Sequence, residues 1–236
     1  MTSEAMMNEL LRYDTPSISN VIATFPNQKT CLGLYNPWEG RWYTDETLRC
    51  MFPEHGRRVG RVVTAVYGMP DGFNRLGFSD ILNAIAAVDG PVILAIKQNF
   101  PEHIRRRNGL LGGNMLTAYK KIGVCGILTD GPSRDLEEIR PLGIQCMFTG
   151  LSPAHGPFSV QAVNVPVSIC GMDLCPGEIV HMDENGAVKF PNQYIGDVLD
   201  KVQRLQKIEQ ERQEKMRNSS DVEEIIRIMN GFEDNK

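Results

Sequence analysis

The chain has 236 residues, of which 42% are hydrophobic and 23% are charged, an ordinary globular composition. The 29 acidic residues outnumber the 25 basic ones, and the resulting net charge of −4 offers no basic face for duplex nucleic acid. No run approaches the roughly 20 apolar residues of a membrane span, and no secretory pattern opens the chain. We therefore expect a soluble, cytoplasmic protein that binds neither nucleic acid nor membrane.

Six cysteines and four histidines are scattered along the chain without a CxxC motif or a metal-type spacing. This distribution argues against a zinc site. Several cysteines stand inside apolar runs, such as residues 124–127 and 168–171. We expect them to be buried, reduced thiols.

The first part of the chain predicts two helices followed by an ordered loop. The helices fall within residues 1–26, and the second begins with Thr15 as N-cap and Pro16 at the first helical position. Residues 30–58 mix aromatic side chains with glycine, proline and charges and show no regular period.

The middle of the chain alternates strands with helices. Strands are expected at residues 60–67, 91–96, 126–129 and 145–149, and helices at 79–88, 113–122 and 136–140. After residue 158 four short strands follow, at 159–163, 165–169, 178–183 and 187–190, with a hairpin turn at 183–186. The alternation predicts an α/β core, and the later strands predict a sandwich or barrel-like layer on that core.

The C-terminal residues have helical spacing from Ile195 to Ile208 and then a run of charged and amide side chains. Ser220 and Glu223 have the spacing of a capping box before a second amphipathic helix. We expect an α/β domain over residues 1–195 and a helical extension over 196–236. The charge run is typical of a solvated face, and the apolar stripe could alternatively dock on a neighbouring subunit.

One segment, residues 112–135, combines groups that suit the binding of an anion and a cation. Gly112 and Gly113 open a helix whose first N–H groups, on Asn114 and Met115, would face an anion. The following strand ends in a loop that bears Arg134 and Asp135. Arginine clamps carboxylates, and aspartate supplies a hard oxygen ligand for Mg²⁺. A surface ion pair at Arg134–Asp135, and a simple turn at Asp130–Gly131, remain the alternatives from spacing alone.

This segment resembles the family that contains regulator of ribonuclease activity A (RraA) and the class II 4-hydroxy-4-methyl-2-oxoglutarate/4-carboxy-2-hydroxyadipate (HMG/CHA) aldolases. The likeness extends over about residues 10–195, with further matching motifs at residues 59–65, 163–171, 176–178 and 183–191. The resemblance implies an αββα sandwich with a swivelling-domain-like β core. It also implies trimers or hexamers with the site at a subunit boundary.

In the aldolase branch, the resemblance implies that Arg134 binds the substrate carboxylate and Asp135 anchors Mg²⁺ or Mn²⁺. The amides of Asn114 and Met115, at the start opened by Gly112 and Gly113, would also hold the substrate. The expected chemistry is carbon–carbon bond cleavage in a small 2-oxo acid, by aldol cleavage or decarboxylation, because a bound metal stabilises the enolate that both reactions form.

Position 113 departs from the aldolase pattern, which has Asp or Glu there, separated from the Arg-Asp pair by twenty intervening residues. Glycine at this position resembles the regulator branch and removes a carboxylate that helps proton transfer. The alternatives are therefore a non-catalytic regulator that binds a ribonuclease or another protein, or a metal-dependent enzyme of a different reaction type.

Two further groups of residues are candidates for the site. Lys97 follows a buried strand, and the basic loop at 102–108 contains His103 and three arginines. Lys97, His103 or one of these arginines could reach a distal carboxylate or phosphate of the substrate. His155 lies in a Pro- and Gly-containing loop that the family places near the site, and a histidine could supply the acid–base function missing at position 113. The plain alternatives are a solvated loop and a surface histidine.

Overall fold

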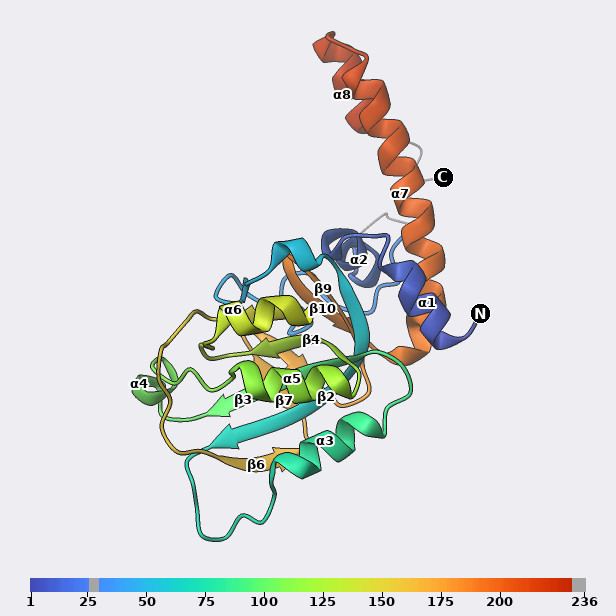
Figure 1. Ribbon diagram of the computed structural model, residues 1–236. Helices are drawn as coiled ribbons and strands as arrows, with labels where there is room; N and C mark the ends of the chain where they lie inside the picture. Colours follow the sequence, from blue (N-terminus) through green and yellow to red (C-terminus); the bar gives the residue numbers. More distant parts are fainter. Residues whose placement is uncertain (26–29, 231–236) are drawn as a thin grey trace.

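The computed structural model describes residues 1–25 and 30–230 and has a mixed α/β fold (Figure 1). An eight-stranded, nearly closed sheet has the order β1-β5-β4-β3-β2-β9-β10, with β6 also paired to β2, and β7 and β8 form a separate two-stranded sheet. The strands are β1 Arg49–Cys50, β2 Arg58–Gly68, β3 Val92–Asn99, β4 Val124–Thr129, β5 Gln145–Phe148, β6 Ser159–Val163, β7 Val167–Ile169, β8 Met172–Leu174, β9 Ile179–Asp183 and β10 Gly186–Phe190.

Strands β2, β3, β4 and β5 are parallel neighbours and form the centre of the sheet. The crossovers between them contain the helices α3 Phe78–Ala86, α5 Gly113–Lys121 and α6 Leu136–Ile139, together with the short helix α4 Glu102–Arg105. The carboxyl ends of the four parallel strands lie at one edge of the sheet, which is where α/β proteins gather their binding residues.

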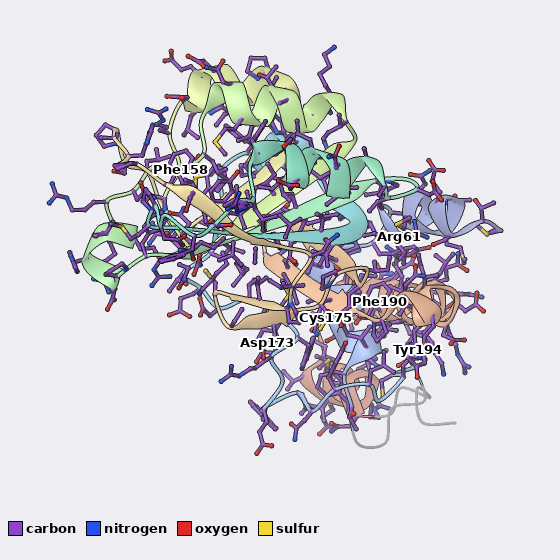
Figure 2. The ribbon with its side chains drawn as sticks, turned by 90° about the horizontal axis from the view of Figure 1, so that it is seen from below. Arg61, Phe158, Asp173, Cys175, Phe190 and Tyr194 are labelled. Atoms are coloured by element: carbon purple, nitrogen blue, oxygen red, sulfur yellow. The ribbon has the colours of Figure 1, made fainter. Side chains whose placement is uncertain are left out.

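The parallel strands are buried on both faces. Because side chains alternate across a strand, Ile127 of β4 packs with α3, α5 and α6, whereas Leu128 packs with the β7–β8 hairpin. Figure 2 shows these layers from below: the green helices cover one face of the sheet, and the hairpin that bears Asp173 covers the other. The continuous apolar runs in these strands follow from this double coverage.

A second set of helices covers the antiparallel end of the sheet. The helices α1 Ser3–Leu10, α2 Thr15–Ile22 and the first half of α7 Ile195–Arg217 pack with Ile179, Val188 and Phe190 of β9 and β10. The second half of α7 projects beyond the body, and α8 Val222–Asn230 lies near its far end (Figure 1). Val222, Ile226 and Met229 of α8 are exposed.

The predicted α/β alternation and the 183–186 hairpin turn are confirmed, with local differences. The sequence did not predict the short strands β1, which lies inside the expected loop 30–58, and β8. Asp14, not Thr15, caps α2: its Oδ1 accepts the N–H of Ser17 at 2.8 Å, and Pro16 is the second helical residue. Likewise Asp221, not Ser220, accepts the N–H of Glu223 before α8. In both cases two capping residues stand side by side, and spacing alone does not choose between them. The basic segment at 102–108, expected to be a loop, contains the short helix α4. The helical region expected over residues 1–26 ends at position 26, which lies outside the described residues.

All six cysteines lie in the described part of the chain and are free thiols, as expected. The predicted burial of the thiols in the apolar runs is wrong for Cys125 and Cys170, which are half-buried, whereas Cys146 is buried. Among the described helices none is both long and apolar enough to cross a membrane.

Candidate active site

The loop after β4 is held between two other segments at the carboxyl edge of the sheet. Ser133 forms parallel bridges with both Leu111 and Leu151, and its Oγ donates to the Leu111 carbonyl at 2.7 Å. The N–H of Arg134 donates to the same carbonyl at 3.1 Å. These contacts bring residues 111–113 next to the Arg134–Asp135 pair, as the sequence predicts.

Asp135 stands in the left-handed region, with φ 61°, immediately before α6. Aspartate is one of the few residues other than glycine that tolerate this conformation. The turn directs the carboxylate back to the start of α5, where Oδ2 accepts the N–H of Gly113 at 3.2 Å. The other oxygen, Oδ1, has no hydrogen-bond partner within the described chain. It is therefore open to an external ligand.

Arg134 places its Nε 3.6 Å from Asp135 Oδ2, beyond hydrogen-bond distance. This Nε atom is buried and has no hydrogen-bond partner among the described residues, although about a third of the side chain is exposed. An unpaired guanidinium nitrogen in such a position fits a bound carboxylate, which arginine can engage through two N–H groups.

The glycines at the start of α5 are required by close contacts. A Cβ on Gly112 would lie 2.5 Å from Asp135 Oδ2 and 3.2 Å from Arg134 Nε. A Cβ on Gly113 would lie 2.9 Å from the Cβ of Glu138 and 3.0 Å from its Cδ. Only glycine lets the two charged groups and Glu138 approach the helix start this closely. The N–H groups of Asn114 and Met115 belong to the first turn of α5, which has no acceptor within the helix.

A cavity of about 530 Å³ opens beside this cluster. It is lined by Arg134, Asp135, Leu136, Glu137, Glu138, Leu151, Ser152 and Pro153. The residues fit a small carboxylate together with a hard divalent cation, because Mg²⁺ needs only one or two carboxylates and keeps several waters. In residues 1–25 and 30–230 no group of three or more His, Cys, Asp or Glu side chains is arranged around a metal position. Asp135, whose carboxylate is fixed to the start of α5, could hold the cation, and Glu137 and Glu138 are further carboxylates on the same cavity.

Lys97 lies in a different cavity, of about 810 Å³, which shares only Leu151 with the first. Its Nζ is 2.6 Å from Asp130 Oδ2, and Arg105 Nη1 is 3.0 Å from the same oxygen. The Asp130 side chain is only 2% exposed. Its carboxylate is therefore a buried ion-pair partner of Lys97 and Arg105, which differs from the simple turn at Asp130–Gly131 that spacing alone suggests. The structure thus separates Lys97 from the Arg134–Asp135 pair.

His155 is exposed and lines neither of these two cavities. Its Nδ1 lies 2.9 Å from the carbonyl oxygen of Gly156, and its ring lies beside Phe158. The loop that bears it is fixed to the basic segment, since Ser152 Oγ donates to the carbonyl of Arg107 and Gly109 N–H donates to the carbonyl of Ala154. His103 of that segment is also exposed. An acid–base role for either histidine stays a prediction.

Six residues that line the Arg134–Asp135 cavity were not predicted as site residues: Leu136, Glu137, Glu138, Leu151, Ser152 and Pro153. Glu138 lies in the helix that the sequence predicts at 136–140, but the approach of its side chain to Gly113 depends on the left-handed turn at Asp135.

These features define a class: an α/β protein whose candidate ligand site lies at the carboxyl edge of a parallel sheet, where a Gly-Gly helix start meets an Arg-Asp turn. Residues 33–189, more than half of the chain, match the RraA-like family, described as Aldolase/RraA. The chain therefore belongs to this family, and the predicted membership is confirmed.

Individual relatives are distant. The chain is 26% identical over 118 residues to an uncharacterized protein, MJ0644, of Methanocaldococcus jannaschii, covering 49% of this chain and 57% of that protein. It is 30% identical over 86 residues to a 4-hydroxy-4-methyl-2-oxoglutarate aldolase of Thermus thermophilus, covering 36% and 52%. The match thus spans about half the length of these two curated relatives. A solved structure, that of Streptomyces coelicolor RraAS2, is described as an unusual member of the RNase ES inhibitor RraA protein family. It superimposes on this chain with a TM-score of 0.67 at 21% sequence identity, and the match covers 87% of this chain and 94% of RraAS2. The two proteins therefore share the fold.

Proposed function

We propose that this protein is a divalent-metal-dependent carbon–carbon lyase that cleaves a small 2-oxo acid by aldol cleavage or decarboxylation. The observation that supports this most directly is the pairing of an unpartnered, buried Arg134 Nε with the half-free Asp135 carboxylate in one cavity. A 2-oxo acid presents a carboxylate and an adjacent keto oxygen, which suit the arginine and the cation respectively.

The chain's own residues bind and orient this substrate. Arg134 takes the substrate carboxylate, and the amides of Asn114 and Met115 donate to the same anionic end from the first turn of α5. Asp135 holds Mg²⁺ or Mn²⁺, which, when bound, supplies positive charge next to the oxygen that becomes negative as the carbon–carbon bond breaks. Leu136, Leu151 and Pro153 give the cavity an apolar side, against which the carbon chain of the substrate would lie.

A direct assay tests the proposal. Purified protein is incubated with Mg²⁺ or Mn²⁺ and offered oxaloacetate and 4-hydroxy-2-oxo acids, and pyruvate release is followed with lactate dehydrogenase and NADH. We expect release that requires the metal and stops with EDTA. Absence of metal-dependent release from every substrate in this panel would contradict the proposal.

A second candidate function is a non-catalytic regulator that binds a ribonuclease. Two observations favour it: glycine at position 113, and the exposed apolar side chains of α8, which offer a protein surface. Tight capture of a purified ribonuclease E-type enzyme by the metal-free protein, without pyruvate release, would favour this function over lyase activity.

We also propose that the protein assembles into homotrimers or homohexamers, with the helical extension over residues 196–236 taking part in the contacts. Its support is family membership and the apolar face of α8. Light scattering on the full chain would give the subunit number, and a monomer at micromolar concentration would contradict this assembly.

A further inference from the structure

The cavity of about 810 Å³ that contains Lys97 is separate from the Arg134–Asp135 site and has no role in the proposed lyase chemistry. Its volume falls within the roughly 300–1,000 Å³ that is usual for small-molecule sites. Four basic side chains from β1, β3 and the α4 segment line it: Arg49, Lys97, Arg105 and Arg106. Such a concentration of positive charge in a concave site favours an anionic ligand.

The buried Asp130 carboxylate fixes two of these cations in place. Its Oδ2 lies 2.6 Å from Lys97 Nζ and 3.0 Å from Arg105 Nη1, and its Oδ1 accepts the N–H of Gln98 at 2.8 Å. One negative charge faces two positive charges, so the cluster keeps a net positive charge. Because the carboxylate is buried and hydrogen-bonded through both oxygens, the two cations are ordered before a ligand arrives, which lowers the entropic cost of binding.

Both cations keep donors that no described residue uses. An ammonium group has three N–H donors and a guanidinium group has five. Within the described chain, Lys97 Nζ donates only to Asp130, and Arg105 engages Asp130 only through Nη1, which leaves its Nε and Nη2 without a hydrogen bond. The two side chains are 33% and 30% exposed, so these donors can reach a ligand in the cavity.

The loop before β1 and the β7–β8 hairpin supply the same cavity with carboxylates and a hydroxyl. The N–H of Asp45 donates to the carbonyl of Cys170 at 2.8 Å, which fixes the loop to the hairpin, and Asp45 Oδ1 accepts the N–H of Thr47. In contrast, Asp45 Oδ2, the Glu46 carboxylate and Ser168 Oγ make no hydrogen bond with any described residue. Free carboxylate oxygens accept hydroxyl protons of a ligand and repel a second anionic group.

We propose that this cavity binds a polyhydroxylated organic monophosphate, such as a sugar phosphate, independently of the lyase site. The phosphate group accepts N–H donors of Lys97 and Arg105, and hydroxyl groups of the ligand donate to Asp45 and Glu46. A phosphate has three terminal oxygens, enough for the ammonium group and two guanidinium N–H groups at once, whereas a carboxylate has two. The free carboxylates of the cavity favour hydroxyl groups, and not a second phosphate, at the other end of the ligand.

Isothermal titration calorimetry on the full chain, freed of metal with EDTA, tests the ligand class. The probes are ribose 5-phosphate, fructose 6-phosphate and glycerol 3-phosphate, with inorganic phosphate and gluconate for comparison. We expect at least one of the three organic phosphates to bind about tenfold or more tightly than inorganic phosphate, which lacks the hydroxyl contacts, and than gluconate, which lacks the phosphate. Absence of binding by all three, or equal affinity for either comparison compound, would contradict the proposal.

Variants locate the binding in this cavity. Lys97→Gln should weaken binding of the tightest organic phosphate by about tenfold or more, because a charged hydrogen bond is lost. Lys120→Gln, which changes an exposed lysine of α5, is the matched control and should leave the affinity unchanged. Arg134→Gln should also leave it unchanged, since Arg134 lines the other cavity. Loss of binding in Arg134→Gln with retention in Lys97→Gln would place the anion at the lyase site and overturn the inference.

A second variant separates a lost contact from a lost fold, since Lys97→Gln removes one partner of the buried Asp130 carboxylate and lowers stability. Arg49 is exposed and pairs with no described residue, so Arg49→Gln should keep the wild-type melting temperature. We expect it to weaken binding about threefold at low salt, because it removes a positive charge from the cavity. Wild-type affinity in a folded Lys97→Gln overturns the inference directly, and if that variant does not fold, wild-type affinity in Arg49→Gln overturns it.

Discussion

The Asp135 carboxylate accepts the backbone N–H of Gly113 at 3.2 Å and so ties the turn before α6 to the first residue of α5. The contact is possible because Asp135 adopts the left-handed conformation and because Gly112 has no side chain in the way. One oxygen of the carboxylate is thereby held in place while the other stays open to the cavity. Three predictions concern this arrangement, and a fourth concerns the stability of the fold.

Asp135→Asn should abolish metal binding without unfolding the turn. Asparagine tolerates the left-handed conformation and can still accept the Gly113 N–H, but it removes the negative charge. We expect Mn²⁺ affinity to fall at least tenfold, measured by electron paramagnetic resonance of free Mn²⁺, with an almost unchanged melting temperature. Asp135→Ala should lose metal binding and also about 1 kcal/mol of unfolding free energy from backbone strain. Wild-type Mn²⁺ affinity in Asp135→Asn would exclude this residue as the metal anchor.

Gly112→Ala should disrupt the site while the fold stays intact. The added Cβ would meet Asp135 Oδ2 at 2.5 Å and Arg134 Nε at 3.2 Å, so both groups must move. Displacements approaching an ångström lower rates by about 100-fold in well-oriented sites, and we expect a 10- to 100-fold loss of kcat/KM. Gly72→Ala is the control, since a Cβ there meets nothing within 4 Å. Equal kcat/KM in both variants would show that the close contact is unimportant.

Arg134→Lys should weaken substrate binding despite keeping the charge. Lysine cannot engage a carboxylate through a planar pair of N–H groups. The loss of a charged hydrogen bond of about 1.5–3 kcal/mol corresponds to a roughly 10- to 100-fold lower kcat/KM for oxaloacetate, expressed mainly as a higher KM. Arg12→Lys, in an exposed pair with Glu9, serves as the control. An unchanged KM in Arg134→Lys would argue against a carboxylate clamp.

His181 is a fully buried, neutral histidine under the N-terminal helices. Its Nε2 lies 3.3 Å from the carbonyl of Leu10, which can only accept, so Nε2 carries the proton and Nδ1 accepts from Thr15 Oγ1 at 2.8 Å. Burial lowers the pKa of His181 from 6.5 to about 4. Between these values the unfolded chain binds a proton that the folded protein does not, and the folded state therefore loses stability as the pH falls.

We expect the free energy of unfolding to fall by about 1.6 kcal/mol more between pH 6.5 and pH 5 in the wild type than in His181→Asn, because one pKa unit corresponds to 1.36 kcal/mol and the unfolded histidine is already half protonated at pH 6.5. Urea titrations at the two pH values measure this difference. His103→Asn, which changes an exposed histidine, should keep the wild-type pH dependence. Parallel profiles for the wild type and His181→Asn would contradict a neutral buried His181.

The α/β alternation and the Gly-Gly and Arg-Asp segments were predictable because each depends on short-range patterns: apolar runs for strands, helical spacing and a conspicuous charged dipeptide. The placement of Glu138 was not, because it depends on the left-handed turn at Asp135, which no local pattern announces. The partner of Lys97 was not predictable either. Lys97 lies in β3 beside Asp130, the residue after β4, because the parallel register pairs Ile96 with Thr129, and its Nζ forms an ion pair with the Asp130 carboxylate.

The initial rate of pyruvate release across a Mn²⁺ titration is the most direct test of a metal-dependent lyase site built on Arg134 and Asp135. It is measured with oxaloacetate and with a 4-hydroxy-2-oxo acid, in the wild type and in Asp135→Asn. Release in the wild type should rise with Mn²⁺ to a plateau, and Asp135→Asn should remain at the protein-free rate for the same Mn²⁺ concentration. Wild-type and Asp135→Asn rates that coincide at every Mn²⁺ concentration would contradict such a site.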